Sequence, residues 1–280
     1  MYIPADTTRL KCIATHRNKK DIAYTRKFTP PAVLESAVGP FTQAHVVITD
    51  TQRDAQPSAP DTLTAALDPN RSTTTAQNID PVHKTLKAIR MKYPRNIVFG
   101  HVNINSVRNK FHNVTDILQA DLIDILAITE TKLDASFPKH QFYLDGFKVT
   151  RNDFTKNSGG IMIILRDDIA HSRKCEYEFT TEHVQCIVLE CIVKQEKWYF
   201  VTFYKSPKVK NRDFIECVTK TFDCLSQVAK EIILVGDVNI DMSTDNCFTN
   251  NICNIYGLCN LINEHALNLQ TKHCLILLLY

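Results

Sequence analysis

Hydrophobic and polar positions follow two different periods along the chain beyond about residue 95. Apolar residues at helical spacing predict helices over 109–120 and 211–229, because one face of a helix recurs every three to four residues. Mostly apolar runs predict buried strands at 96–103, 123–128 and 161–165, and in the run that ends at Asp237. Two further runs, 184–193 and 198–204, flank a polar turn and predict a hairpin. This alternation fits either a mixed-sheet α/β sandwich or a doubly wound sheet.

The N-terminal part of the chain has a different composition. Eight of the eleven prolines fall in residues 1–90, and residues 50–80 are rich in Thr, Ala, Pro, Gln and Asp with little apolar periodicity. Such a segment buries too little surface to offset the entropy of ordering, so residues 1–82 are predicted to be mostly disordered. Residues 83–280 are then long enough for one domain, which a short helix over 82–91 introduces.

Polar residues stand at the ends of four predicted strands. They are Asn103, Glu130, Tyr204 and the pair Asp237 and Asn239. Asp237 and Asn239 are two residues apart, so on an extended chain both point to the same side. A carboxylate, an amide and a phenol on one rim of a sheet would suit a metal ion and an attacking water. Each residue also has an ordinary structural explanation. The two asparagines and Asp237 could simply form turns, Glu130 could be a surface residue, and Tyr204 could be half-buried packing.

Four motifs carry these residues: N-I-N-S-V-R-N-K, I-T-E-T-K, Y-K-S-P and G-D-V-N. In order and spacing they resemble the endonuclease/exonuclease/phosphatase superfamily, also called DNase I-like, over about residues 84–280. The sequence segments around the first two motifs look most similar to the apurinic-type endonuclease domain of non-LTR retrotransposons. In those elements the domain accompanies a reverse transcriptase. The resemblance implies an α/β fold, a four-layer β-sandwich in which two mixed sheets pack face to face with helices outside.

The resemblance also implies a role for each residue. Glu130 and Asp237 would bind Mg²⁺, and Asp237 would orient or deprotonate the attacking water. Asn239 and Tyr204 would contact the phosphate, while Asn103 would orient Glu130 or contact the phosphate as well. The implied activity is Mg²⁺-dependent nicking of duplex DNA at a target site. No small-molecule cofactor and no membrane are implied, and the oligomeric state stays open.

The C-terminal region departs from the family pattern. A helix is predicted over 247–263 and a strand over 275–280, and residues 262–280 align with the family's T-L-I-D segment. Leu277 falls where the family has an acidic residue, and no S-D-H motif follows. We therefore expect a sandwich that is incomplete at its C-terminus and impaired catalysis. An inactive retroelement remnant, or a fragment that binds DNA or protein, is the alternative; a lipid phosphoesterase ranks last, because no lipid-facing insertion is visible.

Composition limits the possible classes of protein further. The formal net charge of +3 permits DNA binding without indicating it. Ten cysteines without a disulfide framework, and no signal peptide, predict free thiols and an intracellular protein, nuclear or cytoplasmic rather than secreted. No apolar run approaches the roughly 20 residues of a membrane-spanning helix. Neither a phosphate-binding loop nor a serine-hydrolase elbow occurs in the sequence.

Overall fold

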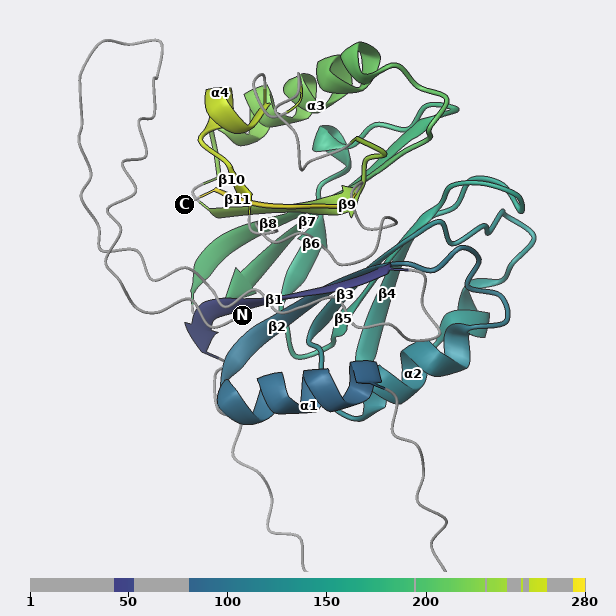
Figure 1. The fold of residues 1–280 in the computed structure, drawn as a ribbon, viewed down its shortest axis with the longest axis vertical. Coiled ribbons are helices and arrows are strands. Elements are labelled where there is room, and N and C mark those ends of the chain that lie inside the picture. Colours follow the sequence, from purple (N-terminus) through teal and green to yellow (C-terminus); the bar gives the residue numbers. More distant parts are fainter. Residues whose placement is uncertain are drawn as a thin grey trace, which may run out of the picture.

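Two β-sheets pack face to face, with helices on their outer faces (Figure 1). The computed structural model describes residues 43–52, 81–193, 195–229, 231–240, 248, 252–260 and 274–279. One sheet has five strands, in the order β1 (Gln43–Gln52), β2 (Asn96–Asn103), β3 (Ile125–Thr129), β5 (Ile161–Arg166) and β4 (Phe147–Asn152). The other has six, in the order β10 (Cys259–Asn260), β11 (Cys274–Leu279), β9 (Glu231–Asp237), β8 (Glu196–Lys205), β7 (Val184–Val193) and β6 (His171–Arg173).

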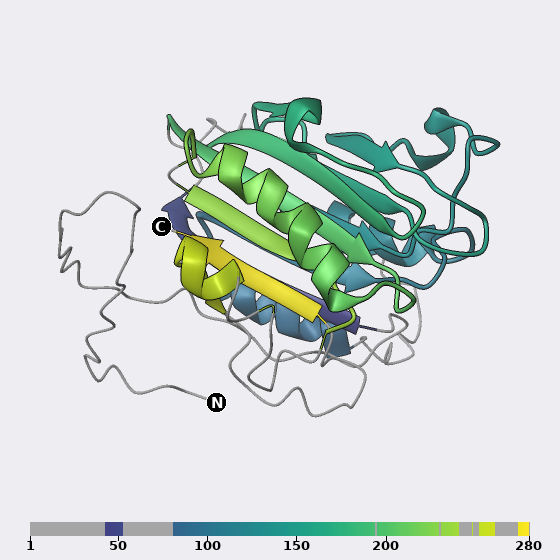
Figure 2. The same cartoon turned by 90° about the horizontal axis from the view of Figure 1, so that it is seen from above.

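The helices complete the four layers. Helices α1 (Pro81–Lys92) and α2 (Phe111–Gln119) lie on the five-stranded sheet, and α3 (Asn211–Leu225) and α4 (Asn254–Tyr256) lie on the six-stranded one (Figure 2). Two short 3₁₀ helices span Lys139–Phe142 and Cys175–Tyr177. The predicted sandwich of two mixed sheets flanked by helices is thereby confirmed. Within the described ranges, no helix is long and apolar enough to cross a membrane.

Three apolar layers hold the sandwich together. Along β2, Val98 and Val102 face the helices, whereas Ile97 and Phe99 face the opposite sheet. Phe99 meets Phe200 of β8 across the sheet interface, with 5.4 Å between ring centroids. Because both faces of the central strands are buried, the strands appear in the sequence as mostly apolar runs and do not alternate between apolar and polar residues.

Strand direction determines where the polar residues gather. β2 and β3 run parallel, with Asn103 beside Thr129, and β8 and β9 run parallel, with Tyr204 beside Asp237. The carboxyl ends of each parallel pair therefore lie at one edge of their sheet. The remaining strand pairs in both sheets are antiparallel.

The structure differs from the sequence-based expectations at both ends of the chain. β1 lies within the segment predicted to be mostly disordered and pairs antiparallel with β2; the rest of residues 1–80 lies outside the described residues. The helix predicted over 247–263 is wrong at its end, because β10 occupies Cys259–Asn260 and pairs with β11. Helical periodicity cannot reveal this strand, since it is two residues long and depends on β11 for its hydrogen bonds.

The pairing of β11 shows which of its residues lies beside Asp237. β11 runs antiparallel to β9, so that Cys274 lies beside Asp237 and Leu277 lies beside Leu234. Leu277 is three residues further along the strand, which is about 10 Å at the rise of a β-strand. The residue of β11 whose backbone neighbours Asp237 is therefore Cys274.

Candidate active site

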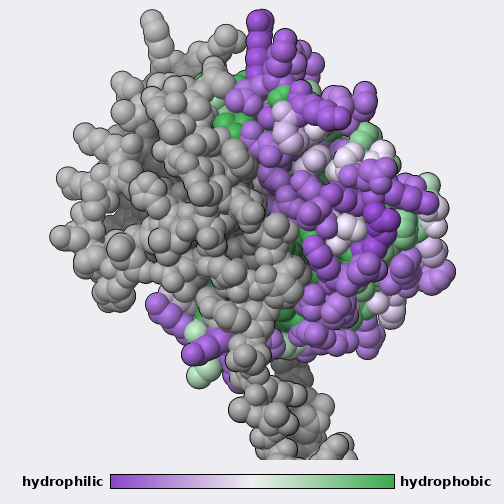
Figure 3. Space-filling view, turned by 45° about the vertical axis from the view of Figure 1, so that its right-hand side comes forward, coloured by the Kyte–Doolittle hydropathy of each residue, from purple (hydrophilic) through white to green (hydrophobic). Residues whose placement is uncertain are grey.

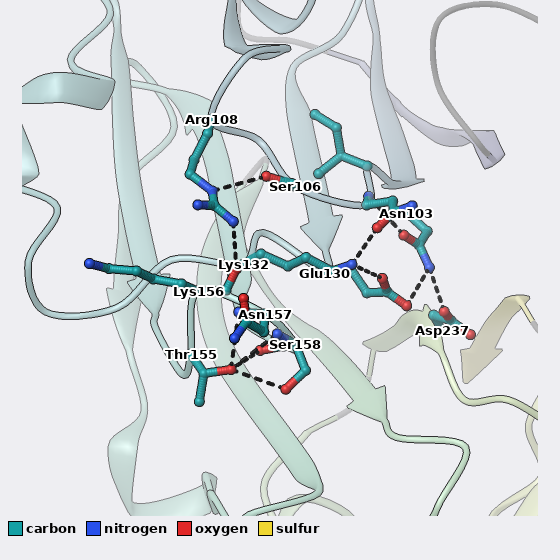
Figure 4. A network of polar contacts seen from close by, with 12 residues as sticks. Asn103, Ser106, Arg108, Glu130, Lys132, Thr155, Lys156, Asn157, Ser158 and Asp237 are labelled. Atoms are coloured by element: carbon teal, nitrogen blue, oxygen red, sulfur yellow. Dashed lines mark hydrogen bonds and ion pairs between the residues drawn. The ribbon is translucent and has the colours of Figure 1, made fainter.

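Asn103, Glu130 and Asp237 come together where the two sheets meet (Figure 4). Asn103 is the last residue of β2, Glu130 directly follows β3, and Asp237 is the last residue of β9. The structure thus brings the predicted strand ends together, but it takes them from both sheets, whereas the sequence pattern predicted one rim of a single sheet. Tyr204, one residue before the end of β8, lies beside Asp237 in the strand register.

The Asn103 amide bridges the two carboxylates. Its Nδ2 donates to Asp237 Oδ2 at 2.6 Å and to Glu130 Oε1 at 3.2 Å. Its Oδ1 accepts a hydrogen bond from the backbone N–H of Asn105 at 3.1 Å. Asn103 and Asp237 are buried, so these hydrogen bonds offset the desolvation of the carboxylate. Asn103 therefore fixes the relative positions of both acidic groups, while its role in catalysis stays a prediction.

Tyr204 is buried next to both carboxylates. Burial raises the pKa of its phenol, and the negative charges of Glu130 and Asp237 raise that pKa further. All three causes favour the protonated phenol over the phenolate. Tyr204 therefore stays a hydrogen-bond donor at neutral pH, which is the form that can donate to an anionic ligand.

Asn239 shapes the loop after β9. Its backbone N–H donates to Asp237 Oδ1 at 3.3 Å, and its side-chain Nδ2 donates to the backbone oxygen of Lys205 at 2.7 Å. The Asx turn considered as the ordinary alternative is thus present. The turn contacts Asp237 Oδ1, whereas Asn103 contacts Asp237 Oδ2. A turn-forming Asn239 can therefore also help to orient the Asp237 carboxylate. Phosphate binding by Asn239 stays a prediction.

Lys205 was missed by the sequence reasoning. Its side chain is buried, only 1% of the residue is exposed, and its Nζ donates to the backbone oxygen of Asn239 at 3.5 Å. Burial lowers the pKa of Lys205, and the nearby Asp237 carboxylate opposes that change. The only signal in the sequence was the position next to Tyr204, which says nothing about a buried ammonium.

Strained backbone collects around this cluster. Seven non-glycine residues in the described ranges have positive φ angles, and five of them line the site: Asn105, Ser106, Glu130, Lys132 and Asn239. Residues in the left-handed region persist when neighbouring contacts hold them there. Ser106 N–H donates to Glu130 O at 2.8 Å, and Lys132 N–H donates to Gly159 O at 2.9 Å. Such a concentration of strain supports a functional site at this edge.

Basic side chains lie next to the carboxylates (Figure 4). Arg108 Nη2 donates to the backbone oxygen of Lys156 at 2.5 Å, and both cations lie over the ring of Phe137, at 5.9 and 5.8 Å from its centroid. Lys132 lies between these cations and Glu130. The described part of the face drawn in Figure 3 is largely hydrophilic. Lys132 and Lys156 pair with Glu130 and Asp134, so cations and carboxylates alternate on the surface beside the site.

The oxygen ligands suit magnesium better than zinc. Within the described ranges, no group of three or more His, Cys, Asp or Glu residues could hold a metal ion. Two carboxylates, Glu130 and Asp237, share the cluster with the amide oxygens of Asn103 and Asn105. Mg²⁺ typically takes one or two carboxylates and completes its shell with water and phosphate, whereas structural zinc needs four Cys or His ligands. The residues present therefore fit Mg²⁺, with Glu130 as the more accessible ligand.

Comparisons with known proteins give similarities of architecture. No family model and no curated protein matches the chain. Among solved structures, the endonuclease domain of TRAS1, a telomere-specific non-LTR retrotransposon, is 14% identical, with 63% of this chain and 82% of that chain covered at a TM-score of 0.48. The 3′ phosphatase NExo from Neisseria, bound to a product DNA hairpin, is 18% identical, with 63% and 84% covered at 0.45.

An AP endonuclease from Archaeoglobus fulgidus gives a similar match, 15% identical with 64% and 84% covered at a TM-score of 0.44. All three TM-scores are below 0.5 and all three identities are below 25%, so these likenesses carry no argument about function. The chemistry of this chain has to be argued from its own residues.

Proposed function

We propose that this chain is a Mg²⁺-dependent phosphodiesterase that nicks duplex DNA and derives from a non-LTR retrotransposon. The observation that carries the proposal is the Asn103 bridge, which brings Glu130 and Asp237 from opposite sheets to one point. The four motifs that hold Asn103, Glu130, Tyr204 and Asp237 support the retroelement origin through their order and spacing. A nuclear or cytoplasmic location belongs to the same proposal.

Each side chain has a distinct part in the proposed hydrolysis. Glu130 would hold Mg²⁺, which would supply Lewis-acid stabilisation of charge on the phosphoryl oxygens. Asp237, oriented by Asn103 Nδ2 and by the backbone N–H of Asn239, accepts a proton from the attacking water. Tyr204, held in the protonated form, donates to a phosphate oxygen. Asn103 keeps Glu130 and Asp237 in their relative positions.

Plasmid nicking tests this proposal. The purified chain is incubated with supercoiled plasmid in Mg²⁺ and in EDTA, together with Glu130→Gln and with Glu216→Gln, an exposed carboxylate on α3 paired with Lys220. We expect open circles that require Mg²⁺, that are lost in Glu130→Gln and that persist in Glu216→Gln. Nicking in EDTA, or undiminished nicking by Glu130→Gln, would contradict the proposed site.

We further propose that hydrolysis is slow. Leu277 stands where the resembling family has an acidic residue, and its hydrocarbon side chain can neither bind a metal ion nor take part in proton transfer. Groups that assist proton transfer typically contribute about 10²- to 10⁴-fold to the rate. A folded chain that shifts duplex DNA in a gel but leaves the plasmid supercoiled after long incubation would favour the DNA-binding alternative over the nuclease.

Loss of the Tyr204 hydroxyl is expected to slow nicking without preventing DNA binding. Tyr204→Phe removes one hydrogen bond to a charged group, worth roughly 1.5–3 kcal/mol, or about ten- to a hundredfold in rate. The measurement is the initial nicking rate at saturating plasmid, with anisotropy on a labelled duplex as the binding control. Tyr199→Phe, on the opposite face of β8, serves as the matched variant. Equal rates for Tyr204→Phe and the wild type would remove the phenol from the mechanism.

The cations beside the site are expected to bind the DNA backbone. Arg108→Ala combined with Lys156→Ala should weaken binding to a labelled duplex several-fold and lower the slope of log K against log salt by about 2, one for each lost phosphate contact. Lys220→Ala, on the exposed face of α3, is the control and should leave the slope unchanged. Fluorescence anisotropy in EDTA at several salt concentrations gives both quantities. An unchanged slope in the double variant would show that DNA contacts a different face.

A further inference from the structure

Lys132 holds an unusual position among the basic residues near the site. Its Nζ lies 3.6 Å from Glu130 Oε2 and also donates a hydrogen bond to Asn105 Oδ1. The ammonium is therefore held between a carboxylate oxygen and an amide oxygen that belong to two different loops (Figure 4). Both are hard oxygen atoms, the kind of ligand that Mg²⁺ takes in proteins. Lys132 supplies the positive charge to this pair of oxygens.

The backbone builds this arrangement. Asn105, Glu130 and Lys132 all adopt left-handed conformations, with φ angles of 46°, 55° and 54°. Asn105 N–H donates to Asn103 Oδ1, and Lys132 N–H donates to Gly159 O. Left-handed backbone costs of order 1 kcal/mol or more per non-glycine residue. Three such residues around one ammonium therefore indicate that neighbouring contacts maintain this arrangement.

Lys156 provides a contrast within the same region. Its Nζ lies 3.8 Å from Asp134 Oδ2, its side chain is about half exposed, and it lies over the Phe137 ring. The side chains of Lys132 and Glu130 are only 22% and 20% exposed. Of these two lysines, Lys132 pairs with Glu130 and Lys156 pairs with Asp134.

The geometry points to Lys132 as a built-in counter-ion of Glu130, one that a divalent cation must displace in order to bind there. This inference rests on the proposed function, because it takes Glu130 as the ligand of the metal. Two positive charges within about 4 Å of each other repel, so the ammonium and the ion cannot both contact the Glu130 carboxylate at full strength. Before metal binds, the same ammonium offsets the repulsion between Glu130 and Asp237, which share the Asn103 donor. Lys132 is thus a positioning residue that lowers the affinity for metal.

Metal affinity, rather than catalysis, tests the inference. Mn²⁺ alone is the probe, titrated by isothermal calorimetry or by the loss of its free paramagnetic resonance signal, into the wild type, Lys132→Met, Lys132→Arg and Lys220→Met. We expect Lys132→Met to bind Mn²⁺ about fivefold more tightly, which corresponds to the upper part of the range for a partly exposed ion pair. Lys132→Arg keeps the cation, and Lys220→Met removes an exposed cation on α3, so both should match the wild type.

A second readout protects the test from a folding defect. Thermal melts with and without Mg²⁺ should show a larger Mg²⁺-induced rise in Tm for Lys132→Met than for the wild type, because tighter binding to the native state stabilises it more. A merely structural Lys132 would lower the Tm in both conditions equally. An unchanged or weaker Mn²⁺ affinity in Lys132→Met would overturn the inference.

The Glu130→Gln variant distinguishes a failure of this inference from a failure of the proposed function. If Glu130→Gln abolishes Mn²⁺ binding while Lys132→Met leaves the affinity unchanged, the metal site stands and the counter-ion inference fails. If Mn²⁺ binds Glu130→Gln as well as the wild type, or binds none of the proteins, the proposed metal site and the counter-ion inference both fail. If Mn²⁺ binds Lys132→Met but not the wild type, the result supports both the metal site and the counter-ion inference.

Discussion

Replacing Asp237 by asparagine is expected to lower Mg²⁺-dependent nicking by about 10²- to 10⁴-fold, the usual contribution of a positioned general base. Asp237 accepts hydrogen bonds from Asn103 Nδ2 and from the N–H of Asn239, so both of its oxygens are oriented. Asparagine keeps the size of the side chain and one acceptor oxygen but cannot take a proton from water. The fold should therefore survive while the chemistry is lost.

The Asp237→Asn experiment measures initial rates of plasmid nicking next to melting temperatures. Asp116→Asn, an exposed carboxylate on α2, is the matched control and should retain the wild-type rate. DNA affinity in EDTA should change little, because removing a negative charge near a phosphate does not weaken its binding. A rate within tenfold of the wild type would exclude Asp237 as the base.

Replacing Gly236 by alanine is expected to prevent stable folding. A Cβ atom at this position would lie 1.9 Å from the backbone oxygen of Phe203 and 2.8 Å from its carbonyl carbon. Gly236 and Phe203 are neighbours in the parallel pairing of β8 and β9, so neither backbone can move without breaking the ladder. The φ angle of +150° adds strain for any residue with a side chain. We expect a loss of about 4 kcal/mol or more, a large part of the usual total stability of 5–15 kcal/mol.

Gly146→Ala is the matched control for this stability prediction. Gly146 also has a positive φ angle, +75°, but a Cβ there would meet nothing within 4 Å. It should therefore cost only about 1 kcal/mol, from backbone conformation alone. Urea unfolding followed by circular dichroism compares the two variants. Equal midpoints for Gly236→Ala and Gly146→Ala would show that the close approach to Phe203 is relieved by small shifts.

Local pattern was sufficient for the central strands and for the candidate site residues. β2, β3, β8 and β9 are buried on both faces, so each forms a mostly apolar run, and the polar residues at its end are visible in the sequence. Asn103, Glu130 and Asp237 could be selected for this reason. The resemblance of their motifs added the sandwich architecture, which periodicity by itself could not separate from a doubly wound sheet.

Contacts between distant segments were decided only by the tertiary structure. Asn103 and Asp237 are 134 residues apart, and no local pattern encodes their 2.6 Å hydrogen bond. The position of Lys132 between Glu130 and Asn105, and the burial of Lys205, depend on left-handed loops that side-chain periodicity does not report. The register of β11, which sets Cys274 rather than Leu277 beside Asp237, follows from a ladder between strands.

The sequence by itself thus determined which residues end the buried strands and what chemistry they carry, because burial on both faces and strand termination are local properties. The tertiary structure alone decided which of those ends meet, which cation neutralises Glu130, and which residue of β11 neighbours Asp237. The physical reason is that sheet register and cross-sheet contacts arise from packing between segments, where the free energy is shared by residues far apart along the chain.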